Sequence, residues 1–463
     1  MRSVWCPLNT SLYNTGGTSI RHRELEDDDQ PHGAATRSGS VGQVGGYETR
    51  ACVSCRTRVS VLIYESMDRP GGIPSIVLRE MALARSRKDT VFVVCRGSTP
   101  LSDVPATIRL DFHDSPKRWL DRIVSQVAGE TRKLDIVAFS PEAAPVGFLL
   151  QGLAMANPVF ESASLSLTVL HPRDLMRETE SRHVHLLNRF LAHAIGLQNL
   201  VFMNEQCRAT HSTFLGLDLS ANSIVPAPID ERVPRWKCSS NSGRLRIVSV
   251  GRIVKFKAYN FAFPSILAKL VAEGRDVTCD IFGYGREEPR LAELVRVHGV
   301  SDRLRFHGAI ALNQFDEIVS EYDLFVGMGT AALQAAQLGV PTILALVDDE
   351  HGAHGFIDSA PFGNLGEQDK SADRHDLKKL IEWYLGASTE ERKQLSLAGI
   401  RYANRYVVDD YVERLTKESV PRKGVSRQVA SLYCRFYLWM TKDNWLRRCV
   451  QVAKRVQKKV YPK

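Results

Sequence analysis

Continuous apolar runs alternate with stretches of helical period along most of this chain. The first run covers residues 58–64, and it has the character of a strand that is buried on both faces. Similar runs follow at residues 90–95, 134–139, 164–170 and 199–203. The stretches between them, such as 73–87 and 178–195, have the apolar period of helices. This alternation predicts a parallel sheet with helices on both faces.

The same alternation starts again after a polar stretch, residues 226–243, which we interpret as an interdomain linker. Strands are expected at residues 245–250, 277–282, 304–307, 323–327 and 342–346. Helices are expected between them, at residues 261–272, 287–298, 314–320 and 331–338. The chain is therefore predicted to be an α/β protein with two Rossmann-like, doubly wound domains, residues 58–235 and 240–405, that face a cleft.

Both ends of the chain depart from this pattern. Residues 1–57 are rich in Gly, Ser, Thr, Arg and Asp without a sustained period, and we expect a disordered tail there. Residues 406–463 are expected to form a basic helical extension. Residues 421–463 contain twelve lysines and arginines and one acid, so their net charge is +11. The rest of the chain has a net charge of −2, and the whole chain one of +9. Two interpretations of the extension stay open: binding to an anionic membrane surface, or packing against the first domain.

Composition narrows the class of protein. A chain of 463 residues with 44% hydrophobic and 24% charged residues is typical of a globular protein with two large domains. It has no uninterrupted apolar run of about 18 residues, and the uncharged stretch 145–160 is expected to be a buried helix. Nine scattered cysteines favour a reducing compartment. We expect a cytoplasmic protein, peripheral at the inner membrane face through its tail, with no nucleic-acid partner.

Three glycine turns follow predicted strands of the second half. Two of them are followed by a helix, and one by an arginine and a lysine. The residues concerned are Gly251, Arg252, Lys257, Gly283, Gly285, Gly327, Gly329 and Thr330. Backbone amides, a helix N-terminus and a pair of cations are the groups that bind phosphate. Because parallel strands end at one edge of a sheet, these turns predict a single site for an anionic ligand.

Residues 244–346 resemble the C-terminal domain of the group 1 family of retaining glycosyltransferases, which have the two-domain GT-B fold. The matching stretches are VGRIVKFKAYN, CDIFGYGREEPRLAELV, RLRFHGAI and YDLFVGMGTAALQAAQLGVPTILA. The resemblance implies an enzyme that moves a sugar from a nucleotide-sugar donor to a saccharide or lipid-linked acceptor, with retention and without a metal or cofactor. By family frequency it also implies a role in surface polysaccharide biosynthesis.

The resemblance also implies roles for particular residues. Arg252 and Lys257 would hold the donor diphosphate, and the glycines at 327 and 329 would let backbone amides approach it. Family members usually carry two glutamates eight positions apart, and these fall on Val326 and Gln334 here. Glutamine can hydrogen-bond ribose hydroxyls, whereas the valine side chain can neither donate nor accept a hydrogen bond. These two residues leave open a catalytically impaired nucleotide-sugar-binding protein. A sugar-nucleotide epimerase is a second alternative, because such enzymes share the fold.

In the first half, Gly71 and Gly72 follow the first strand, and this Gly-Gly pair resembles the acceptor-side loop of the family. These glycines are predicted to let the backbone approach a donor phosphate or an acceptor, and a plain turn is the competing interpretation. His171 follows the strand at 164–170, so it is expected to point into the cleft and contact the transferred sugar. A capping role for this histidine is the alternative.

Two weaker candidates complete the prediction. Asn204, Glu205 and Arg208 follow the last strand of the first half, where they would either face the cleft or, for Asn204, cap a helix. The loop 348–354 combines acids and histidines and has the residue types of a cation site. Solvated loop residues are the more common outcome of such a cluster, so no metal site is predicted.

Overall fold

The computed structural model describes residues 59–420 except 65–66, 68–70, 88, 96–108, 128–131, 176–181, 237–242 and 418. Predictions for residues 1–57 and 421–463, the disordered tail and most of the basic extension, lie outside this part of the chain. Among the described residues, no helix is both long enough and apolar enough to cross a membrane.

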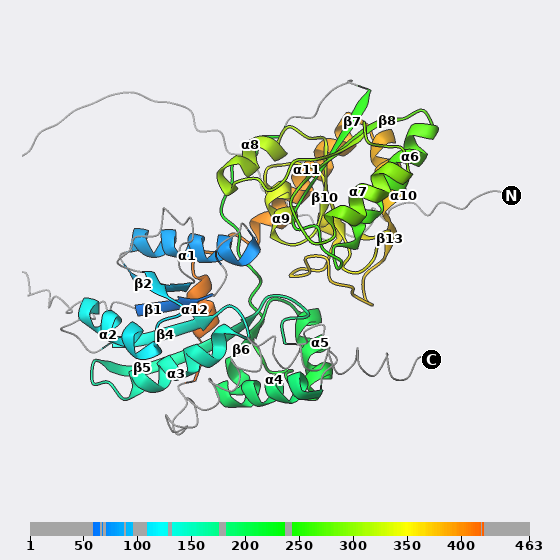
Figure 1. Cartoon of the computed structure of the whole chain (residues 1–463). Helices are drawn as coiled ribbons and strands as arrows, with labels where there is room; N and C mark the ends of the chain where they lie inside the picture. Colours follow the sequence, from blue (N-terminus) through cyan, green and yellow to red (C-terminus); the bar gives the residue numbers. More distant parts are fainter. Residues whose placement is uncertain are drawn as a thin grey trace, which may run out of the picture. The chain divides into compact units, whose positions relative to one another are not determined.

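The first half forms a six-stranded, all-parallel sheet in the order β3-β2-β1-β4-β5-β6 (Figure 1). Its strands are β1 (Val59–Ile63), β2 (Thr90–Cys95), β3 (Arg109–Asp111), β4 (Arg132–Ala138), β5 (Phe160–Val169) and β6 (Leu200–Phe202). Its helices are α1 (Gly72–Arg87), α2 (Pro116–Val127), α3 (Ala143–Met155), α4 (Arg182–Ile195) and α5 (Glu205–Leu215).

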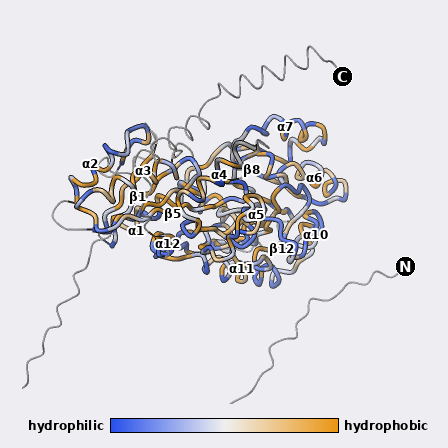
Figure 2. The backbone as a smooth tube through the Cα atoms, turned by 90° about the horizontal axis from the view of Figure 1, so that it is seen from below, coloured by the Kyte–Doolittle hydropathy of each residue, from blue (hydrophilic) through white to orange (hydrophobic). Residues whose placement is uncertain are grey.

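Alternate side chains of these strands enter two different cores. Val61 and Ile63 of β1 pack in the cluster that contains α2 and α3, whereas Leu62 packs with Ile76 and Val77 of α1. Every residue of β1 is buried as a result. Figure 2, in which the tube is coloured by residue hydropathy, shows mostly hydrophobic residues inside and many hydrophilic residues outside. The continuous apolar runs in the sequence therefore arise from a sheet that helices cover on both faces.

The second half forms a seven-stranded sheet in the order β13-β12-β11-β10-β7-β8-β9, parallel from β11 to β9 and antiparallel at the other edge. Its strands are β7 (Arg244–Val250), β8 (Asp276–Phe282), β9 (Leu304–Phe306), β10 (Leu324–Gly327), β11 (Thr342–Ala345), β12 (Gly352–Phe356) and β13 (His375–Asp376). The helices that follow in the chain are α6 (Phe263–Ala272), α7 (Glu288–Val297), α8 (Phe315–Val319), α9 (Thr330–Gln337), α10 (Leu377–Gly386), α11 (Thr389–Asn404) and α12 (Tyr411–Thr416).

The last helix, α12, returns to the first sheet and packs against β4 and β5. The hydroxyl of Ser166 donates to the carbonyl of Leu415 at 2.7 Å, and the backbone N–H of Val420 donates to Asn199 Oδ1 at 2.9 Å. The structure therefore shows α12 and Val420 packed against the first domain. The rest of the predicted basic extension, residues 421–463, lies beyond the described residues.

Most predicted elements are present within a few residues, and the differences have local causes. The stretch 145–160 was expected to be one helix, but α3 ends at Met155 and Phe160 already begins β5. Pro158 disfavours helical backbone at the preceding Asn157, whose side chain instead accepts the N–H of Val159 at 3.0 Å. The short edge strands β3 and β13, and β12 next to β13, were not predicted from the sequence.

Candidate active site

A cleft of about 1160 Å³ lies where the carboxyl ends of strands from both sheets meet. From the first domain it is lined by the N-terminal turn of α1 and the residues after β4 and β5. From the second domain it is lined by the loops after β7, β8, β9 and β10. The predicted site residues in its lining are Gly71, Gly72, His171, Gly251, Arg252, Lys257, Gly283, Gly329, Thr330 and Gln334.

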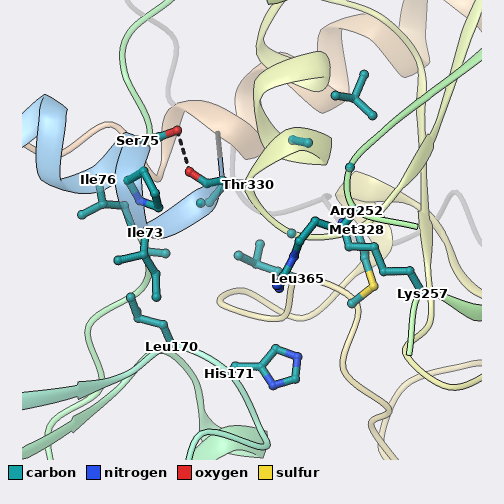
Figure 3. Close-up of a pocket in the computed structure, with 18 of the residues that line it drawn as sticks. Ile73, Ser75, Ile76, Leu170, His171, Arg252, Lys257, Met328, Thr330 and Leu365 are labelled. Atoms are coloured by element: carbon teal, nitrogen blue, oxygen red, sulfur yellow. Dashed lines mark hydrogen bonds between the residues drawn. The ribbon is translucent and has the colours of Figure 1, made fainter. Parts of the chain in front are cut away.

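The second-domain wall of the cleft carries two cations, Arg252 and Lys257 (Figure 3). Among the described residues, no carboxylate lies within ion-pair distance of either one. The guanidinium of Arg252 lies 5.8 Å from the centre of the Phe256 ring. Burial, followed by the charge of Arg252, lowers the pKa of Lys257 to about 8. Two adjacent cations without counter-charges in a partly buried site favour an anionic ligand.

Two helix N-termini meet at the same place. A Cβ added at Gly72, the first residue of α1, would lie only 3.4 Å from Oγ1 of Thr330, the first residue of α9. The first N–H groups of each helix have no partner within the helix, and the helix dipoles add partial positive charge there. The amide of Gly329 does not contribute to this surface, because it donates to the carbonyl of Leu365 at 2.7 Å.

His171 lies on the first-domain side of the cleft, opposite the two cations (Figure 3). Its Nδ1 accepts the backbone N–H of Arg173 at 3.1 Å, so the neutral ring carries its proton on Nε2. Burial, together with the charges of Arg173 and Arg252, lowers the pKa of His171 to about 4. Nε2 is buried and has no hydrogen-bond partner among the described groups. His171 is therefore a neutral donor in need of an acceptor.

Gly283 and Gly285 allow the loops after β7 and β8 to lie against each other. A Cβ at Gly283 would lie 1.8 Å from the carbonyl oxygen of Gly251, and one at Gly285 would lie 1.7 Å from that of Ile253. Backbone bonds join the same loops, including the N–H of Gly251 to the carbonyl of Phe282 at 2.9 Å. These glycines position the loop that carries Arg252.

Gly285 and Gly327 do not line the cleft, so the sequence prediction that placed them in the ligand site does not match this geometry. Gly327 is the buried last residue of β10, where a Cβ would lie 2.7 Å from the Phe325 ring. Its lack of a side chain serves packing. Val326 beside it is also fully buried, whereas Gln334 on α9 lines the cleft with 8% of its surface exposed.

Sequence reasoning missed Glu367, a carboxyl group in the cleft lining. It is 5% exposed, and burial raises its pKa to about 7 although hydrogen bonds from Leu365 and Asn204 act in the opposite direction. Glu367 lies in a loop without regular structure, far from any of the glycine turns in sequence. No periodicity or motif marks it.

The weaker first-domain candidates have structural partners. Asn204 caps α5, because its side chain accepts the N–H of Cys207 at 2.7 Å. Glu205 and Arg208 pair with each other at 2.6 Å on the same helix. None of the three lines the cleft, so the capping interpretation of Asn204 is confirmed and the cleft-facing one is wrong.

In the loop 348–354 the acids pair with arginines. Asp348 pairs with Arg173 of the first domain, Asp349 with Arg374 at 2.6 Å, and Glu350 with Arg290 at 3.1 Å. His354 is buried and bonds to the carbonyl of Glu367 at 2.8 Å. Within the described ranges, no three His, Cys, Asp or Glu side chains are grouped to share a metal ion.

Comparison with known proteins agrees with this geometry. Residues 244–361 match the family model described as glycosyl transferases group 1. Comparison with curated protein sequences gives no match.

Three solved structures illustrate the fold. HepE from Anabaena, solved with UDP and glucose, is 14% identical over 78% of this chain and 98% of its own, with a TM-score of 0.53. Sucrose-phosphate synthase from Thermosynechococcus elongatus is 15% identical over 82% and 99%, with a TM-score of 0.54. A mutant of S. aureus TarM, solved with UDP, Fondaparinux and alpha-GlcNAc-glycerol, is 10% identical over 78% and 99%, with a TM-score of 0.52. These likenesses confirm the predicted two-domain GT-B fold.

Proposed function

We propose that this chain, which by its second domain is a group 1 glycosyltransferase, moves a sugar from a nucleoside diphosphate sugar to a saccharide or lipid-linked acceptor. The observation that carries the proposal is the pair of cations on the second-domain wall of the cleft. Arg252, Lys257 and the first turn of α9 face one space without a carboxylate partner among the described residues. A diphosphate has the charge and the oxygen acceptors that such a site requires.

Transfer with retention fits this arrangement without a side-chain nucleophile. In the proposed reaction the bond between the anomeric carbon and the diphosphate oxygen breaks, and the acceptor oxygen forms a bond to the same carbon on the same face of the sugar. An oxygen of the leaving diphosphate takes the proton of the acceptor hydroxyl. Negative charge then builds up on the diphosphate, where Arg252, Lys257 and the α9 amides would stabilise it. These groups would supply the charge stabilisation that a metal provides elsewhere, so we propose metal-independent transfer.

His171 would bind the transferred sugar rather than transfer a proton. With its pKa near 4 it is neutral at pH 7, and its Nε2–H can donate to a sugar hydroxyl. Asp174 cannot easily serve as a nucleophile, because its Oδ2 already accepts the backbone N–H groups of Leu170 and His171 at 3.0 and 2.9 Å. That carboxylate fixes the turn that presents the histidine.

We propose a UDP-sugar as the first donor class to test, because HepE and TarM were both solved with UDP. Binding should be measured by calorimetry with UDP, GDP and ADP, and then with UDP-glucose and UDP-GlcNAc. Transfer and hydrolysis of the radiolabelled sugars should follow.

The decisive variant is Arg252→Ala with Lys257→Ala. Hydrogen bonds between charged groups are each worth about 1.5–3 kcal/mol, so the double variant should lose at least about a hundredfold in nucleotide affinity. Lys255→Ala is the matched control, because Lys255 lies in the same loop but is exposed and outside the cleft lining. Unchanged affinity in the double variant would show that the donor diphosphate binds elsewhere.

The second candidate function is binding without transfer. It is favoured by one observation, the buried Val326 and uncharged Gln334 at the positions of the family's two glutamates. Tight binding of a UDP-sugar with no turnover in the presence of saccharide acceptors would support this alternative.

A further inference from the structure

The loop 361–368 brings a single carboxyl group, that of Glu367, into the wall of the cleft. Its Oε2 accepts two hydrogen bonds, from the backbone N–H of Leu365 at 2.7 Å and from Asn204 Nδ2 at 3.1 Å. No side chain of the described part of the chain donates to its Oε1. The residue's own backbone N–H is the remaining partner of the carboxylate. The protein thus fixes Oε2, and Oε1 keeps capacity to accept a hydrogen bond from a ligand.

The loop is built so that this carboxyl group cannot easily move. The backbone carbonyl of Glu367 accepts from Asn364 Nδ2 at 3.0 Å and from His354 Nε2 at 2.8 Å. Gly366 has a φ of +117°, and a Cβ there would lie 2.6 Å from the carbonyl oxygen of Ala345. The N–H of Gly363 donates to the Tyr406 hydroxyl at 2.7 Å. Such fixed placement of a buried acid is typical of a functional group rather than of a solvated loop residue.

The loop also lies against the proposed phosphate site. The carbonyl of Leu365 accepts the N–H of Gly329, the residue before α9, at 2.7 Å. Glu367 is two residues further along and lies between this turn and Asn204 of the first domain. A sugar attached to a diphosphate at the α9 N-terminus would therefore extend toward the wall that contains Glu367. Val326, where the family carries a glutamate, is fully buried and cannot reach a ligand.

We propose that Glu367 is a specificity-determining residue of the donor site, whose Oε1 accepts hydrogen bonds from hydroxyl groups of the transferred sugar. This inference rests on the proposed function and adds a contact that neither the family motifs nor the sequence spacing indicate. With a pKa of about 7 the carboxyl group of Glu367 is partly ionised at neutral pH, and its ionised form accepts hydroxyl bonds more strongly than a neutral oxygen does. It would select sugars whose hydroxyls point toward this wall, and it would contribute nothing to the nucleotide part of the donor.

The test is Glu367→Gln, with dissociation constants measured by calorimetry for UDP, UDP-glucose and UDP-GlcNAc. The Gln oxygen can still accept from Leu365 and Asn204, and the atom facing the cleft changes from an acceptor to a donor. We expect an unchanged constant for UDP and a loss of about ten- to hundredfold for the preferred UDP-sugar. An unchanged dissociation constant for UDP in the same variant would show that its nucleotide site is still folded. Glu350→Gln, an exposed carboxylate outside the cleft lining, is the matched control and should change neither constant.

The outcomes separate the two proposals. If the parent protein binds none of UDP, GDP and ADP, the proposed function is overturned and this inference with it. If the parent binds a UDP-sugar and Glu367→Gln keeps the parent's ratio of UDP to UDP-sugar affinity, only the role of Glu367 is overturned, even where the rate of transfer falls.

Discussion

Lys257 should make nucleotide binding depend on pH, and Lys257→Arg should remove that dependence. Its side chain lies over the Gly251 turn, where a Cβ on Gly251 would come 2.5 Å from Nζ. Burial and the charge of Arg252 lower its pKa to about 8 in the free protein. A bound diphosphate favours the charged amine, so the pKa in the complex should rise toward its ordinary value of 10.5.

The size of the effect follows from this difference. Because the pKa is higher in the complex, binding takes up a proton when the pH is above about 8, and affinity falls as the pH rises through that range. The charged fraction of Lys257 in the free protein falls from about 0.9 at pH 7 to about 0.1 at pH 9, which corresponds to a loss of about tenfold in UDP affinity. Arginine stays charged throughout this range, so the variant should lack this contribution.

Calorimetry at pH 7, 8 and 9, in buffers with different ionisation enthalpies, measures both the affinity and the number of protons taken up. Proton uptake should approach one at pH 9 in the parent and stay near zero in Lys257→Arg. The comparison with the variant also corrects for titration of the nucleotide itself. Equal pH profiles in the two proteins would refute a cationic role for Lys257 at the diphosphate.

Three further predictions concern other parts of the molecule. Gln334→Leu should weaken UDP binding by about 1–3 kcal/mol in calorimetry because it removes a polar partner, whereas Gln334→Glu should preserve binding. Gly283→Ala should weaken UDP binding at least tenfold and lower the free energy of unfolding by about 1–3 kcal/mol, since its Cβ would lie 1.8 Å from the Gly251 carbonyl oxygen. The control is Gly152→Ala, whose Cβ would meet nothing within 4 Å. In a urea titration this control should leave the free energy of unfolding unchanged or raise it. The intact chain should co-sediment with anionic vesicles at low salt and be released at high salt, whereas a chain that ends at Val420 and keeps α12 should stay in the supernatant. Equal sedimentation of the two chains would show that the basic extension does not bind the membrane.

Most of the parallel strands could be predicted because they contain runs of apolar residues, whereas the parallel strand β3, with the sequence RLD, was not predicted. The predicted strands are enclosed by helices on both faces, which gives the sequence a strong and local signal. The edge strand β13 consists only of His375 and Asp376, and β12 has the sequence GAHGF, so neither contains an apolar run. Their pairing depends on contacts with β11 and not on their own sequence.

The same distinction applies to the candidate site. Arg252 and Lys257 follow a glycine turn at the end of a strand, and the structure places both in the cleft as that local pattern predicts. Glu367 reaches the cleft through partners distant in sequence, such as Asn204, which is 163 residues away. A loop that is fixed by such long-range contacts has no recognisable pattern in its own local sequence. Gly327 was predicted in the site but lies outside the cleft lining. The sequence alone does not distinguish a glycine that packing requires from one that allows a ligand to approach the backbone.

The lowered pKa values of His171 and Lys257 have a common origin in burial and in the positive charge of the cleft. Arg252 acts on both groups, and Lys257 itself acts on His171. A bound diphosphate would offset this charge and raise both pKa values, but the two groups start from different points. Lys257, at about 8, would become fully charged, whereas His171, at about 4, starts about three units below neutral pH and would remain uncharged. The same ligand would thus strengthen the cation that stabilises the leaving diphosphate and leave the histidine as the neutral Nε2–H donor that a sugar hydroxyl requires.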